Sequence, residues 1–120
     1  MNNTFWKKKN KYGAKKCRCN QNHIHDSGFE ANYCNELQLR VNAADIKDYE
    51  TQKRFDLHGR DGKKVCSHYP DFLIEKFDGT KYVDECKSKG TVTSTWRLKK
   101  ALFEHEYPEI QYNVIWMKKY

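Results

Sequence analysis

The stretch 69–87, YPDFLIEKFDGTKYVDECK, decides the fold of this chain. The dipeptide Asp78-Gly79 is a strong signal for a hairpin turn, and strand-forming residues flank it on both sides. Because side chains alternate between the two faces of a strand, Glu85 and Lys87 point the same way. A loop of odd length, or one bulge, places Asp71 directly across from Glu85, where cross-strand neighbours are ~5 Å apart at Cβ.

This arrangement of charged side chains predicts a metal site. Two carboxylates that face each other repel unless a cation lies between them, and oxygen ligands with room for water and phosphate suit Mg²⁺. A lysine on the same face can orient or deprotonate an attacking water, or stabilise negative charge in a transition state. The alternative is a solvated strand face or a cross-strand salt bridge. Apolar neighbours such as Val83 and the run 72–74 indicate central strands. A charged side chain buried there is costly unless it is paired or binds a metal.

On the N-terminal side of this stretch, residues 17–25 alternate in type around a short polar loop, which indicates a β-hairpin. A helix then begins near Ser27, which has the capping-box spacing to Glu30, and ends near Asn42. The apolar stripe expected on this helix consists of Phe29, Tyr33, Leu37 and Val41.

The remaining elements are three strands, a helix and a last strand. The strands are expected at 49–57, 65–77 and 81–87, and the last strand at 110–117. Ser94 or Thr95 is predicted to cap the second helix, which runs to about residue 106 and is followed by Pro108.

Length, charge and cysteine content limit the number of domains, the kind of partner and the cellular setting. The chain has 120 residues, enough for one domain, with a net charge of +7 and a pI of about 9.1. Such a basic balance fits equally a polyanionic partner, usually nucleic acid, and a merely soluble basic protein. No apolar run reaches membrane-spanning length, and five cysteines without a secreted disulfide pattern favour a reducing, cytoplasmic setting. Residues 1–16, rich in lysine and without an acidic residue, are expected to form a flexible basic arm.

The order αβββαβ, with Pro70-Asp71 followed by Glu85-Cys86-Lys87, resembles the PD-(D/E)XK nuclease superfamily, and more narrowly a branch of short phage and prophage nucleases. The runs that carry the narrower resemblance are Lys11–Lys16, Asp26-Ser27 with Glu30-Ala31, Ile46–Gln52, Tyr69–Phe72, Val83–Lys87 and Arg97–Lys100. The resemblance implies an α/β (α+β) fold of restriction-endonuclease type. In that fold a short hairpin precedes an αβββαβ core with a mixed central sheet, and residues 17–120 form a single nuclease domain.

The resemblance also implies roles for individual residues. These are metal ligation by Asp71, Glu85 and the backbone carbonyl of Cys86, catalysis by Lys87, a further acid at Glu30 that binds metal directly or through water, and a supporting role for Gln52. Asp84 departs from the pattern and could serve as ligand in another register, but it faces away from Lys87, so Glu85 is preferred. For Glu30 the alternative is an ordinary capping box.

The hairpin at 17–25 suggests a second metal site. A three-residue loop would pair Cys19 with His23 and Cys17 with His25, so that all four side chains point the same way. Thiolates and imidazoles are standard Zn²⁺ ligands, although structural zinc sites usually contain CxxC turns. The alternative is two small buried cysteines and two surface histidines.

A basic cluster follows the 81–87 strand and could hold phosphates of DNA, or could form a solvated face. Its residues are Lys89, Arg97, Lys99 and Lys100. We interpret Trp96 and Tyr107 as core residues and not as base-stacking groups.

Together these features predict an endodeoxyribonuclease that depends on Mg²⁺ or Mn²⁺. The preferred substrate is branched DNA, as for a Holliday junction resolvase in phage recombination or packaging, acting as a homodimer because two symmetric cuts are needed. If the chain is phage-encoded, it would act in the cytoplasm of the host. The alternatives are a non-catalytic module for DNA binding or phage assembly, and a restriction-like or nicking nuclease on duplex DNA.

Overall fold

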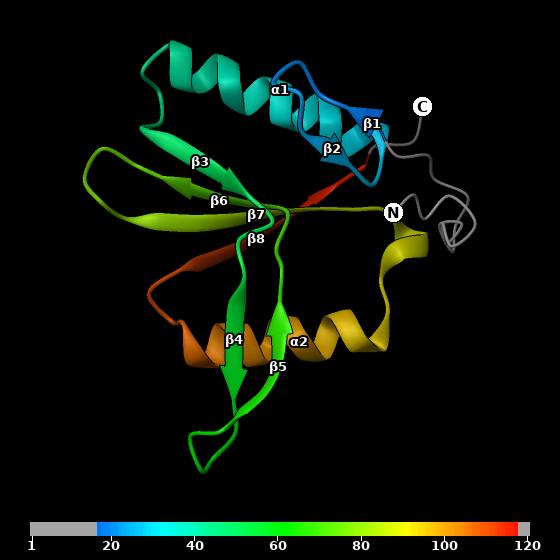
Figure 1. Cartoon of the computed structure of the whole chain (residues 1–120), viewed down its shortest axis with the longest axis vertical. Coiled ribbons are helices and arrows are strands. Elements are labelled where there is room, and N and C mark those ends of the chain that lie inside the picture. Colours follow the sequence, from blue (N-terminus) through cyan, green and yellow to red (C-terminus); the bar gives the residue numbers. More distant parts are fainter. Residues whose placement is uncertain (1–16, 118–120) are drawn as a thin grey trace, which may run out of the picture. The chain divides into compact units, whose positions relative to one another are not determined.

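The computed structural model describes residues 17–117 (Figure 1). They fall into two compact units, which divide between residues 36 and 37. The boundary falls within helix α1 (Gly28–Asn42). The predicted basic arm at 1–16 lies outside the described residues. Neither described α-helix combines the length and the apolar character needed to cross a membrane.

The first unit contains the predicted hairpin. Strands β1 (Cys17–Arg18) and β2 (Ile24–His25) pair antiparallel, with Cys17 opposite His25. The Ser27 hydroxyl then accepts a hydrogen bond from the Glu30 backbone N–H at 3.2 Å, which caps the start of α1. The bounds of hairpin and helix therefore match the prediction.

The predicted apolar stripe of α1 is wrong in its register. Of the four residues expected to be buried only Leu37 is, whereas Phe29, Tyr33 and Val41 are half-buried. The buried positions are instead Glu30, Ala31, Cys34 and Leu37. These residues also repeat at helical spacing, but they include a carboxylate and a thiol, which hydrophobic periodicity does not count.

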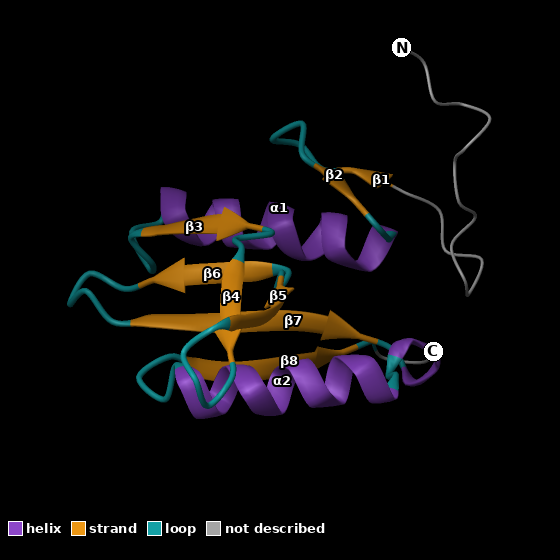
Figure 2. Cartoon of the chain, turned by 60° about the horizontal axis from the view of Figure 1, so that its bottom comes forward, coloured by secondary structure: helices purple, strands orange, loops and turns teal. Residues whose placement is uncertain are grey.

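The second unit is built on a four-stranded mixed sheet with the order β3-β6-β7-β8 (Figure 2). Its elements are β3 (Asp48–Thr51), β4 (Phe55–His58), β5 (Lys64–His68), β6 (Phe72–Glu75), β7 (Lys81–Lys87), the 3-10 helix η2 (Lys89–Thr91), α2 (Ser94–Glu106) and β8 (Gln111–Trp116). Neighbours are antiparallel except β7 and β8, which are parallel and joined through α2. The predicted α/β (α+β) class with a mixed sheet is confirmed.

Two predicted strands are each broken in two. The expected strand 49–57 becomes β3 and β4, and 65–77 becomes β5 and β6. The first break lies at Gln52, whose φ of 54° belongs to the left-handed region, and the second at Pro70, which cannot donate a backbone hydrogen bond. Strands β4 and β5 consequently form a separate hairpin that runs across the direction of the sheet strands (Figures 1 and 2).

This second hairpin closes the hydrophobic core of the unit against α2 and one face of the sheet. The buried cluster consists of Phe55, Leu57, Leu73, Val83 and Phe103. Tyr107 packs against it and donates its hydroxyl hydrogen to the Asp56 carbonyl at 2.8 Å, so its interpretation as a core residue is confirmed. The cap of α2 is Thr93, one residue before the predicted range, because its side chain accepts from the Trp96 N–H.

Candidate functional site

Asp71 and Glu85, here called the carboxylate pair, meet where β6 begins beside β7. Phe72 lies opposite Asp84 in the antiparallel register, and the turn is closed by a Lys76 N–H bond to the Thr80 carbonyl with Gly79 at a φ of 88°. The same register places Asp71 across from Glu85, on the sheet face that carries Leu73 and Val83 of the core. Both carboxylates are buried, with 9% of Asp71 and 4% of Glu85 exposed.

Backbone donors hold the carboxylate pair together. The Asp71 N–H donates to Glu85 Oε2 at 2.8 Å, and the Cys86 N–H donates to Asp71 Oδ2 at 2.9 Å. Each carboxylate is thus bound by the backbone of the opposite strand, and this reciprocal bonding fixes both orientations. Such preorganisation is what a metal or catalytic centre requires of its ligands.

Gln52 also contacts the pair, in agreement with its predicted position near the site. Its Nε2 donates to Asp71 Oδ1 at 3.2 Å, and its backbone N–H donates to the Asp71 carbonyl at 3.1 Å. The left-handed backbone of this non-glycine residue costs about 1 kcal/mol. Strain of that kind is concentrated at functional sites, and here it directs both donors of Gln52 toward Asp71.

Three aromatic residues that sequence reasoning left out of the site support Glu85. Trp96 Nε1 on α2 and the Tyr112 hydroxyl on β8 donate to Glu85 Oε1 at 3.2 and 3.0 Å. The hydroxyl hydrogen of Tyr112 is used in this way, so His68 Nε2, 2.9 Å away, is the donor to the hydroxyl oxygen. Trp96 was interpreted as core, but it lies at the site.

Burial sets the protonation of this network. Desolvation lowers the pKa of His68, with smaller contributions from Lys99 and Lys87 against the opposing effect of Glu85. Desolvation and the negative charge of Glu85 raise the pKa of Tyr112. At neutral pH the His68 imidazole is therefore neutral and the Tyr112 phenol protonated, so His68 can donate to the Tyr112 oxygen while Tyr112 donates to the Glu85 carboxylate.

Lys87, at the end of β7, is held through its ammonium group. Its Nζ lies 4.5 Å from the centre of the Trp96 ring and donates to the Thr91 carbonyl at 3.4 Å. Because Trp96 also donates to Glu85, the lysine contacts the face of the indole whose N–H edge binds the carboxylate. Asp84, by contrast, is bound by the Asn113 amide at 3.0 Å on the opposite face of the sheet.

An open hollow with basic and aromatic walls adjoins this network. Its walls include Trp96, Arg97, Lys100, Val114 and Trp116. The Trp116 side chain is 51% exposed and sits opposite Lys87 in the parallel register. Of the predicted basic cluster, Lys89 and Arg97 are exposed, whereas Lys100 pairs with Glu104 at 2.9 Å and Lys99 is half-buried.

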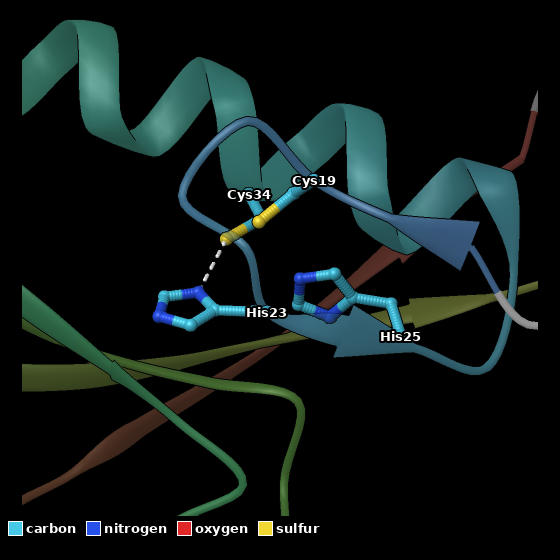
Figure 3. Close-up of side chains that lie close together, drawn as sticks. All are labelled: Cys19, His23, His25 and Cys34. Carbon is cyan, nitrogen blue, oxygen red and sulfur yellow. Dashed lines mark hydrogen bonds between the residues drawn. The ribbon is translucent and has the colours of Figure 1, made fainter.

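The first unit holds a separate group of metal-ligating side chains, the Cys/His cluster of Cys19, His23, His25 and Cys34 (Figure 3). Three of these residues were predicted as zinc ligands, and Cys34 on α1 was missed. Any role of the Cys17 side chain lies outside the described part of the structure. Burial, together with the neighbouring charge of His23, lowers the pKa of His25.

Glu30 lies in the first unit beside this cluster. Its Oε2 is 3.9 Å from His25 Nδ1, and its own exposure is 8%. Asp71, Glu85, Lys87 and Gln52 all belong to the second unit. The assignment of Glu30 to the carboxylate pair stays a prediction, and the structure adds the contact with His25.

The fold and these two groups define a mixed α/β protein with a buried carboxylate pair and a Cys/His cluster. Residues 9–120 match the family described as Protein of unknown function (DUF1064), and the chain belongs to that family. No curated protein and no solved structure matches the chain.

Proposed function

We propose that the chain is a metal-dependent endonuclease that hydrolyses phosphodiester bonds of DNA. The observation that carries the proposal is the buried carboxylate pair, which backbone hydrogen bonds fix in place beside Lys87. Two buried carboxylates on facing strand positions are costly unless a cation offsets their charge. The resemblance to PD-(D/E)XK nucleases assigns that cation and its chemistry to the same residues.

The metal proposed at the carboxylate pair is Mg²⁺ or Mn²⁺. Its ligands would be the oxygens of Asp71 and Glu85 with the Cys86 carbonyl, a hard donor set that suits these ions. When bound, such an ion polarises the phosphate and lowers the pKa of a coordinated water. Lys87 would position that water and offset negative charge at the phosphate, while Gln52 keeps Asp71 in orientation.

The hollow beside the site supports nucleic acid as the substrate. The exposed Arg97 could bind a phosphate, and Lys100 could do so on leaving its pair with Glu104, which also lines the hollow. The exposed Trp116 offers a ring on which an unpaired base could stack. Unpaired bases occur at forks and at the opened centre of a junction, which favours a branched substrate over continuous duplex. Resolution of a four-way junction needs two symmetric cuts and hence a homodimer.

The test is cleavage of end-labelled four-way junction and matched linear duplex by the full chain, with Mg²⁺ and with EDTA. We expect Mg²⁺-dependent cuts in the junction and none with EDTA. Equal cutting of both substrates would favour the restriction-like or nicking alternative. Binding to DNA without cleavage under either condition, with Mn²⁺ also tested, would favour the non-catalytic alternative and overturn the proposal.

A further inference from the structure

The Cys/His cluster already has nearly the dimensions of a tetrahedral metal site. One ligand atom from each of the four residues lies within 4.8 Å of all the others, and His23 Nδ1 is 3.4 Å from Cys34 Sγ. Bonds of 2.0–2.3 Å at tetrahedral angles place the ligand atoms of zinc roughly 3.4–3.8 Å apart. Figure 3 shows the two sulfurs next to each other and the imidazoles facing the same space.

Local sequence explains how the donors converge. The Cys19 N–H donates to the His23 carbonyl at 3.0 Å across a loop in which Asn22 has a φ of 69°. His25 follows two residues later on β2, so strand alternation keeps both imidazoles on one side. Asn35 Oδ1 accepts from the Asn20 N–H at 2.7 Å, which ties the hairpin loop to α1 beside Cys34.

In this segment most of the buried side chains are possible metal ligands, and the large aliphatic side chain is exposed. Among residues 18–36 the buried side chains are Cys19, His25, Glu30, Ala31 and Cys34. The aliphatic residue of the hairpin, Ile24, is 60% exposed. A segment this short cannot bury enough apolar surface to hold a hairpin on a helix, and small units of this kind commonly depend on a metal.

Glu30 lies beside His25 on the side away from the ion's place. Its carboxylate is 3.9 Å from His25 Nδ1, longer than a hydrogen bond, and a small rotation of either side chain would give the acid-to-histidine bond that usually supports a metal-bound imidazole through Nε2.

We propose that the Cys/His cluster binds one Zn²⁺, which fastens the hairpin to α1. Two thiolates with two imidazoles select Zn²⁺ over Mg²⁺, Ca²⁺ or Mn²⁺. Four protein ligands fill the tetrahedral shell, so the role is structural and not catalytic. This site is independent of the carboxylate pair and of the proposed nuclease activity, because its residues and its metal chemistry are different.

The experiment uses the full chain and reads the metal directly. Protein purified under reducing conditions is analysed for zinc by native mass spectrometry, and is then loaded with Co²⁺. We expect one zinc per chain, and thiolate-to-cobalt charge transfer with the d–d bands of a tetrahedral ion. Protein that shows neither zinc nor these cobalt bands, or that contains a Cys19–Cys34 disulfide, would overturn the proposal.

Variants assign the ligands. Cys19→Ser and Cys34→Ser should each weaken metal binding by ~100-fold or more and shift the cobalt charge-transfer band, as loss of a thiolate ligand requires. Cys66→Ser is the matched control, since Cys66 on β5 belongs to the second unit, and it should bind as the parent does. Cys17→Ser should also retain the full spectrum.

A spectrum lost in Cys17→Ser but kept in Cys34→Ser would overturn the choice of Cys34. If the Cys19 or Cys34 variant does not fold, His23→Asn is the second variant, because His23 is exposed and its replacement should disturb packing least. It should keep the thiolate charge-transfer band while the d–d bands change. An unchanged d–d spectrum would remove His23 from the ligand set.

Discussion

Asp71 and Glu85 approach each other from neighbouring strands of a sheet, whereas the Cys/His cluster gathers from a hairpin and the helix that follows it. The first group offers only oxygen donors and the second only sulfur and nitrogen, so the two groups prefer different ions. The carboxylates are fixed by backbone hydrogen bonds that need no metal. The hairpin segment has few apolar residues to hold it. We therefore expect metal loss to stop chemistry in the second unit and to loosen structure in the first.

The largest effect is expected for Asp71→Asn. The amide keeps the size of the carboxylate but loses its charge, so single-turnover DNA cleavage with Mg²⁺ should fall by ~1,000-fold or more. Circular dichroism should be unchanged, and the zinc content should stay at the parent value because the Cys/His cluster is separate. A variant that retains full cleavage would remove Asp71 from the catalytic centre.

Lys87→Ala should show a smaller loss that is confined to the chemical step. Removal of one preorganised charge beside the phosphate should lower the single-turnover rate by ~100-fold. DNA affinity measured in Ca²⁺, where cutting is suppressed, should change little. A normal rate at saturating enzyme with weakened affinity would make Lys87 a phosphate anchor and not a catalytic residue.

Much of the second unit could be predicted because local rules set it. Asp78-Gly79 specifies the turn, and the period-two pattern of strands then brings Asp71 opposite Glu85. The break of strand 49–57 could not be predicted, since the left-handed backbone of Gln52 is held by two hydrogen bonds to Asp71, which is distant in sequence. The support of Glu85 by Trp96 and Tyr112 likewise depends on how α2 and β8 pack.

In the first unit, sequence could predict only part of the Cys/His cluster. The alternation of residues in a short hairpin predicts Cys19, His23 and His25, because it depends on local spacing alone. It does not predict Cys34, because the stripe of large apolar residues on α1 indicates another buried face. A small thiol at helical spacing from Ala31 and Leu37 is the signal that could have revealed it.

Glu30→Gln separates the two roles assigned to Glu30. The 3.9 Å contact with His25 predicts that zinc affinity falls about tenfold, as is usual for loss of an acid behind a metal-bound histidine. Affinity is measured by competition with a chromophoric chelator, alongside DNA cleavage at saturating zinc. Unchanged zinc affinity with a large loss of cleavage would assign Glu30 to the nuclease centre.

The smallest effect concerns how the second unit holds DNA before any metal acts. Lys89 and Arg97 are exposed, whereas Lys100 already pairs with Glu104 and lies 5.2 Å from the Tyr112 ring centre. A cation that already forms an ion pair within the protein contributes less to phosphate binding, because that ion pair must break first. The exposed residues should therefore account for most of the dependence of DNA affinity on salt.

Replacing Lys89 and Arg97 together by Ala should reduce the slope of log affinity against log salt by about 2, near 0.9 for each phosphate contact on duplex arms. Lys100→Ala should reduce it by well under 1. Fluorescence anisotropy with a labelled junction in Ca²⁺ gives the slopes without cleavage. Lys47→Ala is the control for loss of one positive charge, matched to Lys100→Ala, since Lys47 bonds Glu75 at the far end of β6. Equal slopes for the double variant and the parent would mean that these exposed cations face only solvent. DNA would then enter the site by another path.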